Sequence, residues 1–178
     1  MSTEMTVLAC VALPLLAPAL ITALHRWPNP REAVTLLTSG CLLLLVYSLH
    51  DDVLRGARPA IDLLEPVPGL TSGCEVEPLG MLFALLASFL WIVTSVYSIG
   101  YLRSHHEWRQ TSYYSYFAVA LGSTMGIAFA GNLFTLFIFY ELLTLSTYPL
   151  VTHAGDDAAR ESGRMYLGYL LGTSVILL

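Results

Sequence analysis

Apolar residues gather into six stretches of roughly bilayer length, and short polar segments separate them. The stretches cover residues 6–24, 33–50, 79–101, 112–130, 132–152 and 163–178. A helix needs about 20 apolar residues to cross the hydrocarbon core of a bilayer. The pattern therefore predicts an all-α integral membrane protein, with residues 1–178 forming one transmembrane domain of six helices. The last stretch ends on an apolar run without a polar cap, so we expect the domain to be incomplete at its C-terminus.

The polar segments differ in charge between the two sides of this predicted domain. Six arginines follow the first, third and fifth stretches: Arg26, Arg31, Arg103, Arg109, Arg160 and Arg164. The other side has only Arg55 and Arg58, in the long segment 51–78. The positive-inside rule then places the N-terminus outside a multi-pass protein of the inner cell membrane. The segment 51–78 is rich in Pro and Gly, which predicts a turn-rich outer loop or a short hairpin.

Composition supports the membrane interpretation and excludes several functions. Charged residues make up 12% of the chain and hydrophobic residues 56%, whereas soluble domains carry about 25% charged residues. The net charge of -5 argues against a nucleic-acid partner. The three cysteines lie far apart, so we expect no metal or iron–sulfur cofactor. The adjacent pair His105 and His106 has no common zinc spacing and favours a solvated loop, against a membrane-embedded enzyme.

One acidic residue lies inside a predicted membrane-spanning stretch, where inserting a carboxyl group is energetically unfavourable. Twelve of the thirteen acidic residues fall in predicted loops or at the N-terminus, and the exception is Glu141, one residue from the middle of the stretch 132–152. A carboxyl group at this depth costs about 2.5–3.5 kcal/mol on insertion. No basic residue is predicted at the same depth to offset this cost. Glu141 is therefore the candidate proton site of the chain.

Hydroxyl groups lie on the same predicted helix face as Glu141 and on the following stretch. At about 100° per residue, these pathway candidates are Thr144, Tyr148 and Thr152, followed by Tyr166, Tyr169 and Thr173. Such hydroxyls could hold a file of water that leads to Glu141, with His153 feeding protons from the inner end. In the alternative interpretation, the hydroxyls bond back to carbonyls of their own helices, the tyrosines only pack, and His153 has no role.

The segment around Glu141 resembles one family of membrane proteins. The run GNLFTLFIFYELL at 131–143, followed by STYPL at 146–150, is similar to the fifth-helix signature of the proton-conducting antiporter-like subunits. These comprise membrane-arm subunits of respiratory complex I, subunits of Mrp-type cation/proton antiporters, and relatives in membrane-bound hydrogenases. The run 78–101 resembles the family's third helix. The resemblance covers the N-terminal six-helix part of the family.

The resemblance implies a fold and a function. The family fold is a bundle of about fourteen helices built on two inverted repeats, an arrangement that places ion sites near the midplane. Glu141 matches a family glutamate that pairs with a lysine on a broken helix. This chain contains no lysine, and Tyr140 replaces the usual tryptophan.

A subunit that moves protons, or exchanges them for sodium, is therefore expected within a complex of other membrane subunits. That complex could be an oxidoreductase, in which case the redox chemistry belongs to the partners. The alternative is a non-transporting assembly subunit, or a truncated remnant of the family.

Overall fold

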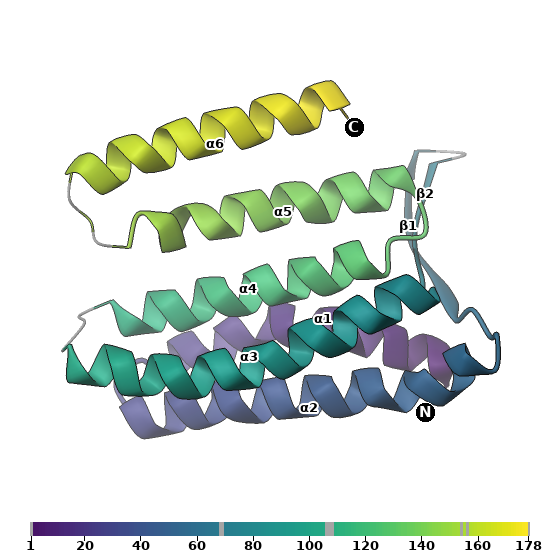
Figure 1. Ribbon diagram of the computed structural model, residues 1–178, viewed down its shortest axis with the longest axis horizontal. Coiled ribbons are helices and arrows are strands. Elements are labelled where there is room, and N and C mark those ends of the chain that lie inside the picture. Colours follow the sequence, from purple (N-terminus) through teal and green to yellow (C-terminus); the bar gives the residue numbers. More distant parts are fainter. Residues whose placement is uncertain (1, 68–69, 106–108, 154, 156, 178) are drawn as a thin grey trace.

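The computed structural model describes the 178-residue chain except for residues 1, 68–69, 106–108, 154, 156 and 178. The described part forms a helical bundle with one β-hairpin (Figure 1). Its elements are α1 (Thr3–Ala23), α2 (Pro28–Leu54), β1 (Ala60–Val67), β2 (Leu70–Glu75), α3 (Pro78–Ser104), α4 (Gln110–Ala128), α5 (Leu133–Val151) and α6 (Asp157–Leu177).

The helices lie side by side and alternate in direction, so that successive connections lie at opposite ends of the bundle (Figure 1). Helix α4 packs against α1, α3 and α5, while α2 packs against α1 and α3. Helix α6 packs on α5 and forms the outer layer of the bundle. Small residues on α4 allow close packing, because a Cβ atom at Gly126 would overlap the Phe139 ring of α5.

The long segment between α2 and α3 contains the hairpin that was one of its two predicted forms. Strands β1 and β2 are antiparallel, with Ala60 opposite Glu75. The hairpin docks on the connection between α4 and α5 through the buried Thr135, whose Oγ1 accepts a hydrogen bond from the Gly73 N–H at 3.0 Å. The Ser72 hydroxyl lies 3.2 Å from the same oxygen. This contact fixes the end of the bundle at which α5 begins.

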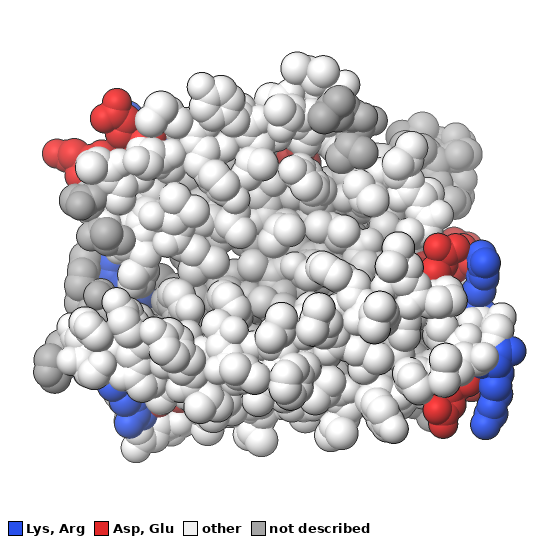
Figure 2. Space-filling model, in the orientation of Figure 1, with Lys and Arg blue, Asp and Glu red and all other residues white. Residues whose placement is uncertain are grey.

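Charged side chains gather at the two ends of the helices and leave a wide belt almost free of charge between them (Figure 2). Four helices, α1, α2, α3 and α5, are long and apolar enough to cross a membrane. Helix α4 begins with a polar turn and α6 with several charged residues, and neither meets the same test. A multi-pass helical membrane protein is thus confirmed, while six membrane crossings stay a prediction.

The helices extend beyond several predicted apolar stretches. Helix α2 begins at Pro28 rather than at residue 33, and α6 begins at Asp157 rather than at residue 163. A proline at the first helical position is favourable because its missing N–H would have no partner there. The first turns of these two helices contain polar residues, which lower the mean hydropathy. Hydropathy alone therefore places the start of each helix too late in the sequence.

Candidate functional site

Glu141 lies near the middle of α5 (Leu133–Val151). The helix begins after Asn132, whose side-chain oxygen accepts a hydrogen bond from the Thr135 N–H at 2.8 Å. Such a cap fixes the start of a helix. With a rise of about 1.5 Å per residue, Glu141 lies about 12 Å from the first residue of α5, Leu133. The side chain is half-buried, and ten residues of α5 follow Glu141.

A hydroxyl group on α6 contacts this carboxyl group. Ser174 Oγ donates a hydrogen bond to Glu141 Oε1, and Ser174 is itself buried. The two helices approach closely at Gly163, where a Cβ atom would overlap the Thr152 methyl group. Glu141 lies eleven residues before Thr152, and Ser174 lies eleven residues after Gly163. The antiparallel packing at Gly163 therefore sets the register that brings Ser174 to Glu141.

Two of the predicted hydroxyl residues, Tyr148 and Thr152, lie on the side of α5 that packs against α6, because a Cβ atom at Gly163 would contact both. Both are half-buried, whereas Thr144 is buried. A pathway along these residues stays a prediction.

The predicted hydroxyl residues of α6 do not all face α5. The Tyr166 hydroxyl lies 3.2 Å from Thr147 Oγ1 of α5. Tyr169, in contrast, is 74% exposed, and Thr173 is also exposed. The Tyr166 hydroxyl thus contacts α5, and the hydroxyl that reaches Glu141 belongs to Ser174, the neighbour of Thr173.

Two of the predicted hydroxyls bond to their own helices. Thr152 Oγ1 donates to the Tyr148 carbonyl at 3.0 Å, and Thr173 Oγ1 donates to the Tyr169 carbonyl at 2.8 Å. This is the alternative that the sequence left open for these side chains. A hydroxyl that is bonded in this way keeps lone pairs with which it can accept a further hydrogen bond.

The carboxyl group of Glu141 has no cationic partner in the described part of the chain. The ion pairs there join Arg31, Arg58, Arg103, Arg160 or His50 to other carboxylates. Lysine is absent from the sequence. The described partner of Glu141 is thus a neutral hydroxyl group, which can bond to a carboxylate or to a protonated carboxyl group.

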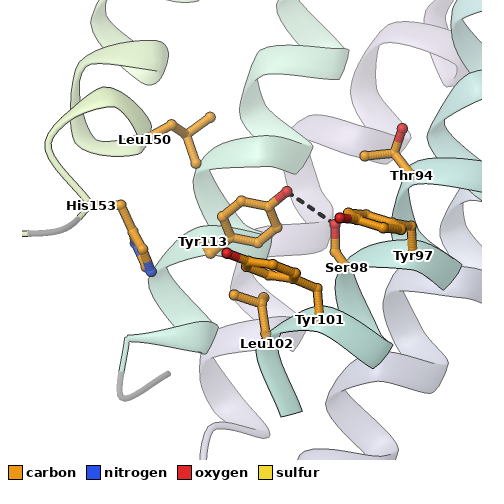
Figure 3. A pocket seen from close by; sticks show the side chains of 8 residues that line it. All are labelled: Thr94, Tyr97, Ser98, Tyr101, Leu102, Tyr113, Leu150 and His153. Carbon is orange, nitrogen blue, oxygen red and sulfur yellow. Dashed lines mark hydrogen bonds between the residues drawn. The ribbon is translucent and has the colours of Figure 1, made fainter. Parts of the chain in front are cut away.

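His153 follows the end of α5 and lies beside α4. Its ring packs edge-on against Tyr113 of α4, with 5.9 Å between ring centroids. Together with Leu150 it lines a cavity between α3, α4 and α5 (Figure 3). In this structure His153 is therefore associated with that cavity and not with the Glu141 stripe.

A second buried carboxylate corrects the expectation that Glu141 alone lies inside the protein. Glu32 was predicted in a loop, but it lies in the first turns of α2 and is 4% exposed. Arg103 of α3 donates to it from Nε at 3.1 Å and from Nη2. Arg31, also 4% exposed, lies 3.5 Å from Glu32 and donates to Gln110 at 2.7 Å. Windows of average hydropathy miss such a cluster, because its charges end the apolar run.

The described residues contain no group of three or more potential metal ligands from His, Cys, Asp and Glu. His105 stacks on Tyr101, with 4.2 Å between ring centroids. His106 lies outside the described residues. The structure thus adds no geometric support to a site built on this pair.

Comparison with known proteins identifies the relatives of this arrangement. The chain is 26% identical over 145 residues to Na(+)/H(+) antiporter subunit A1 of Staphylococcus aureus, which covers 80% of this chain. The same subunit of strain bovine RF122 / ET3-1 is 30% identical over 84 residues, or 47% of this chain. The resemblance to antiporter-like subunits is confirmed. No family model matches the chain.

Solved structures show the same fold. A chain of the Mrp complex from Dietzia sp. DQ12-45-1b superposes with a TM-score of 0.83 over 99% of this chain, at 20% identity. A chain of the membrane-bound sulfane sulfur reductase, an archaeal respiratory membrane complex, gives a TM-score of 0.78 over 90% of this chain, at 18% identity. The match covers 33% of each of those chains, and 18% of the first Staphylococcus aureus subunit. The chain thus spans about a third or less of these relatives' lengths.

Proposed function

We propose that this antiporter-like chain is a proton-translocating subunit of a multisubunit membrane complex, with Glu141 as its proton site. The observation that carries the proposal is a half-buried carboxyl group in the uncharged belt, held by a neutral hydroxyl from the next helix. The relatives named Na(+)/H(+) antiporter subunit support cation exchange as the reaction class. Protons are the transported species, and sodium is the candidate counter-ion.

The chemistry of the site suits a proton carrier. A carboxyl group is expensive within a membrane, so its presence there needs a reason beyond packing. Ser174 can donate to the charged form of Glu141 and accept from the protonated form. Its neutral hydroxyl does not hold the carboxyl group in the ionised state as a salt bridge would. Thr144, Tyr148 and Thr152 extend along α5 as candidate partners for water on the way to the basic end.

Substitution of Glu141 tests the proton site directly. Cation-driven proton movement is measured in inverted membrane vesicles that contain the assembled complex, with Glu141→Gln compared to the wild-type chain. We expect the loss of one proton site to abolish transport, while the chain still inserts and assembles. The matched control is Glu161→Gln on the exposed first part of α6, which keeps transport.

Unchanged transport in Glu141→Gln would overturn the proposal and leave a second candidate function, an assembly subunit without transport of its own. That function is favoured by one observation, the lack of a cationic partner for Glu141 in the described part of the chain. In that case the complex would disperse when the chain is deleted, although transport does not depend on Glu141.

The charges of the chain support a proposal for its location. We place it in the inner cell membrane with six crossings, its N-terminus outside, and other membrane subunits as partners. Because the chain has no lysine, a single introduced lysine marks one side unambiguously. A membrane-impermeant amine reagent should modify Arg58→Lys in intact cells and Arg160→Lys only after permeabilisation, with peptide mass spectrometry assigning the site. The reverse pattern would invert the orientation.

A further inference from the structure

A cavity at the basic end of the bundle is separate from the Glu141 site. It has a volume of about 440 Å³ and is lined by residues of α3, α4 and the end of α5 (Figure 3). On α5 it is bounded by Leu150 and His153, whereas Tyr148 and Thr152 contact Gly163 of α6. Residues 148 and 150 point about 200° apart around a helix. The cavity and the hydroxyl stripe therefore occupy different sides of α5.

The lining of this cavity changes from polar to aromatic. Inside it, the Ser98 and Tyr113 hydroxyls lie 3.0 Å apart, and the His153 ring packs against Tyr113 (Figure 3). Toward the opening, the rings of Tyr97 and Tyr101 stack on each other, with 5.9 Å between ring centroids. Tyr97 is 67% exposed. A ligand seated here would meet hydrogen-bonding groups at one end and aromatic surface at the other.

The cavity opens between α3 and α5, which both pack on α4. It lies in the last turns of α3 and α5 and the first turn of α4, at the end of the bundle with most of the arginines. Tyrosine is enriched at this depth of membrane proteins, where the headgroups of the bilayer meet the hydrocarbon. The opening is therefore positioned at the level of lipid headgroups, beside the acyl chains.

An arginine lies close to the cavity in the sequence. Arg109 precedes α4 and lies four residues before Tyr113, so the two residues share a face of that turn. Its carbonyl accepts a hydrogen bond from the Tyr113 N–H at 3.2 Å. The residues that line the cavity include no Asp or Glu. No carboxylate of the lining therefore opposes a phosphate group in the cavity.

We propose that this cavity is a binding site for one glycerophospholipid, whose phosphate lies beside Ser98, Tyr113 and His153 and whose acyl chains lie along the exposed rings of α3. The volume falls within the range of about 300–1,000 Å³ that is usual for ligand pockets. Hydroxyl and imidazole groups can donate to phosphate oxygens, and Arg109 adds preference for lipids with net negative charge. A wholly apolar ligand would place apolar atoms against the hydroxyl pair of Ser98 and Tyr113.

The test measures lipid that stays with the protein. The protein, with its co-purifying subunits, is placed in vesicles of equal parts phosphatidylglycerol and phosphatidylcholine and extracted in mild detergent. Native mass spectrometry then counts the lipids bound to the chain. Ser98→Leu fills the interior of the cavity, and Tyr113→Phe removes only a hydroxyl group. Ser48→Leu, exposed near the opposite end on α2, is the matched control.

We expect Ser98→Leu to lose one bound lipid and Tyr113→Phe to weaken its retention by about tenfold, the factor that corresponds to 1.4 kcal/mol. Arg109→Gln should reduce the preference for phosphatidylglycerol. Ser48→Leu and Glu141→Gln should retain the lipid, so that failure of the proton site and failure of the lipid site are distinguishable. Excess inorganic phosphate should not displace the lipid, because the acyl chains contribute to binding.

Three results would overturn the proposal. Equal lipid retention by the wild-type chain, Ser98→Leu and Tyr113→Phe would show that the cavity does not hold the lipid. Displacement by inorganic phosphate alone would indicate a phosphate site instead. Loss of a co-purifying subunit from Ser98→Leu without loss of lipid would show that a protein helix covers the opening between α3 and α5.

Discussion

Two carboxylates are shielded inside the bundle, and their surroundings are opposite. Glu32 lies at the basic end, where Arg103 and Arg31 neutralise it. Glu141 lies in the uncharged belt and has a serine hydroxyl as its described partner. Two guanidinium groups donate hydrogen bonds to Glu32 and offset the cost of burying its carboxylate. A carboxyl group beside a neutral hydroxyl can exist in either protonation state, which is the property that proton transport needs.

The first carboxylate therefore has a structural task. Arg103 binds Glu32 and the Asn29 side chain, so it joins the end of α3 to the start of α2. Arg31 reaches α4 through Gln110 and through Thr111, at 3.0 Å. These contacts connect three helices at the end where polar groups meet the belt. Burial alone thus does not identify a proton site, and the partners of the carboxylate decide its role.

The largest effect on stability is expected when glutamate is replaced by glutamine at position 32 and, for comparison, at position 141. Glu32→Gln leaves Arg31 buried without its carboxylate and should reduce the free energy of unfolding by about 3–5 kcal/mol. Glu141→Gln removes a carboxyl group from the belt and should leave thermal unfolding in detergent unchanged or shifted upward. Circular dichroism or scanning fluorimetry of the purified variants measures both effects.

Asp157→Asn provides the control for this comparison. Asp157 and Arg160 form an exposed pair at 3.7 Å on α6, and such pairs contribute little to stability. Equal destabilisation by Glu32→Gln and Glu141→Gln would contradict the distinction, because both carboxylates would then be structural. A stable Glu32→Gln protein that no longer transports protons would assign Glu32 to the transport pathway.

Much of the architecture could be predicted from hydropathy and from the segment around Glu141. Long apolar runs specify helices because a membrane leaves no other way to satisfy the backbone. The Pro- and Gly-rich segment correctly indicated a hairpin as one of two forms. The resemblance to antiporter-like subunits was also visible in the sequence, since it rests on a contiguous run of residues.

Contacts between helices could not be predicted in the same way. Glu32 lies next to the charged Arg31, outside the apolar stretches, so the sequence predicts it in a loop. Its ion pairs with Arg31 and Arg103 become visible only in the structure. The sequence pattern predicts Thr173, and not Ser174, as the hydroxyl residue near Glu141. The two side chains point about 100° apart around the helix, so an error of one residue in register changes which of them faces α5. The choice between them depends on the contact of α6 with α5 at Gly163, which periodicity within one helix does not contain.

The smallest effect is expected from a substitution that tests the register of α6 against α5 at Glu141. Ser174→Ala removes the hydroxyl that donates to Glu141 and should reduce the free energy of unfolding by about 1 kcal/mol, as for a typical intramolecular hydrogen bond. Thr173→Ala is the matched control: both hydroxyls lie within hydrogen-bonding distance of carbonyls of their own helix, but Thr173 is exposed, whereas Ser174 also contacts Glu141. Thermal unfolding in detergent compares the two variants in the wild-type and Glu141→Gln backgrounds, which isolates the coupling between the residues. If Thr173→Ala were the more damaging change, or if Ser174→Ala showed no coupling to Glu141, the contact between α6 and Glu141 would be wrong and the proton site would need another partner.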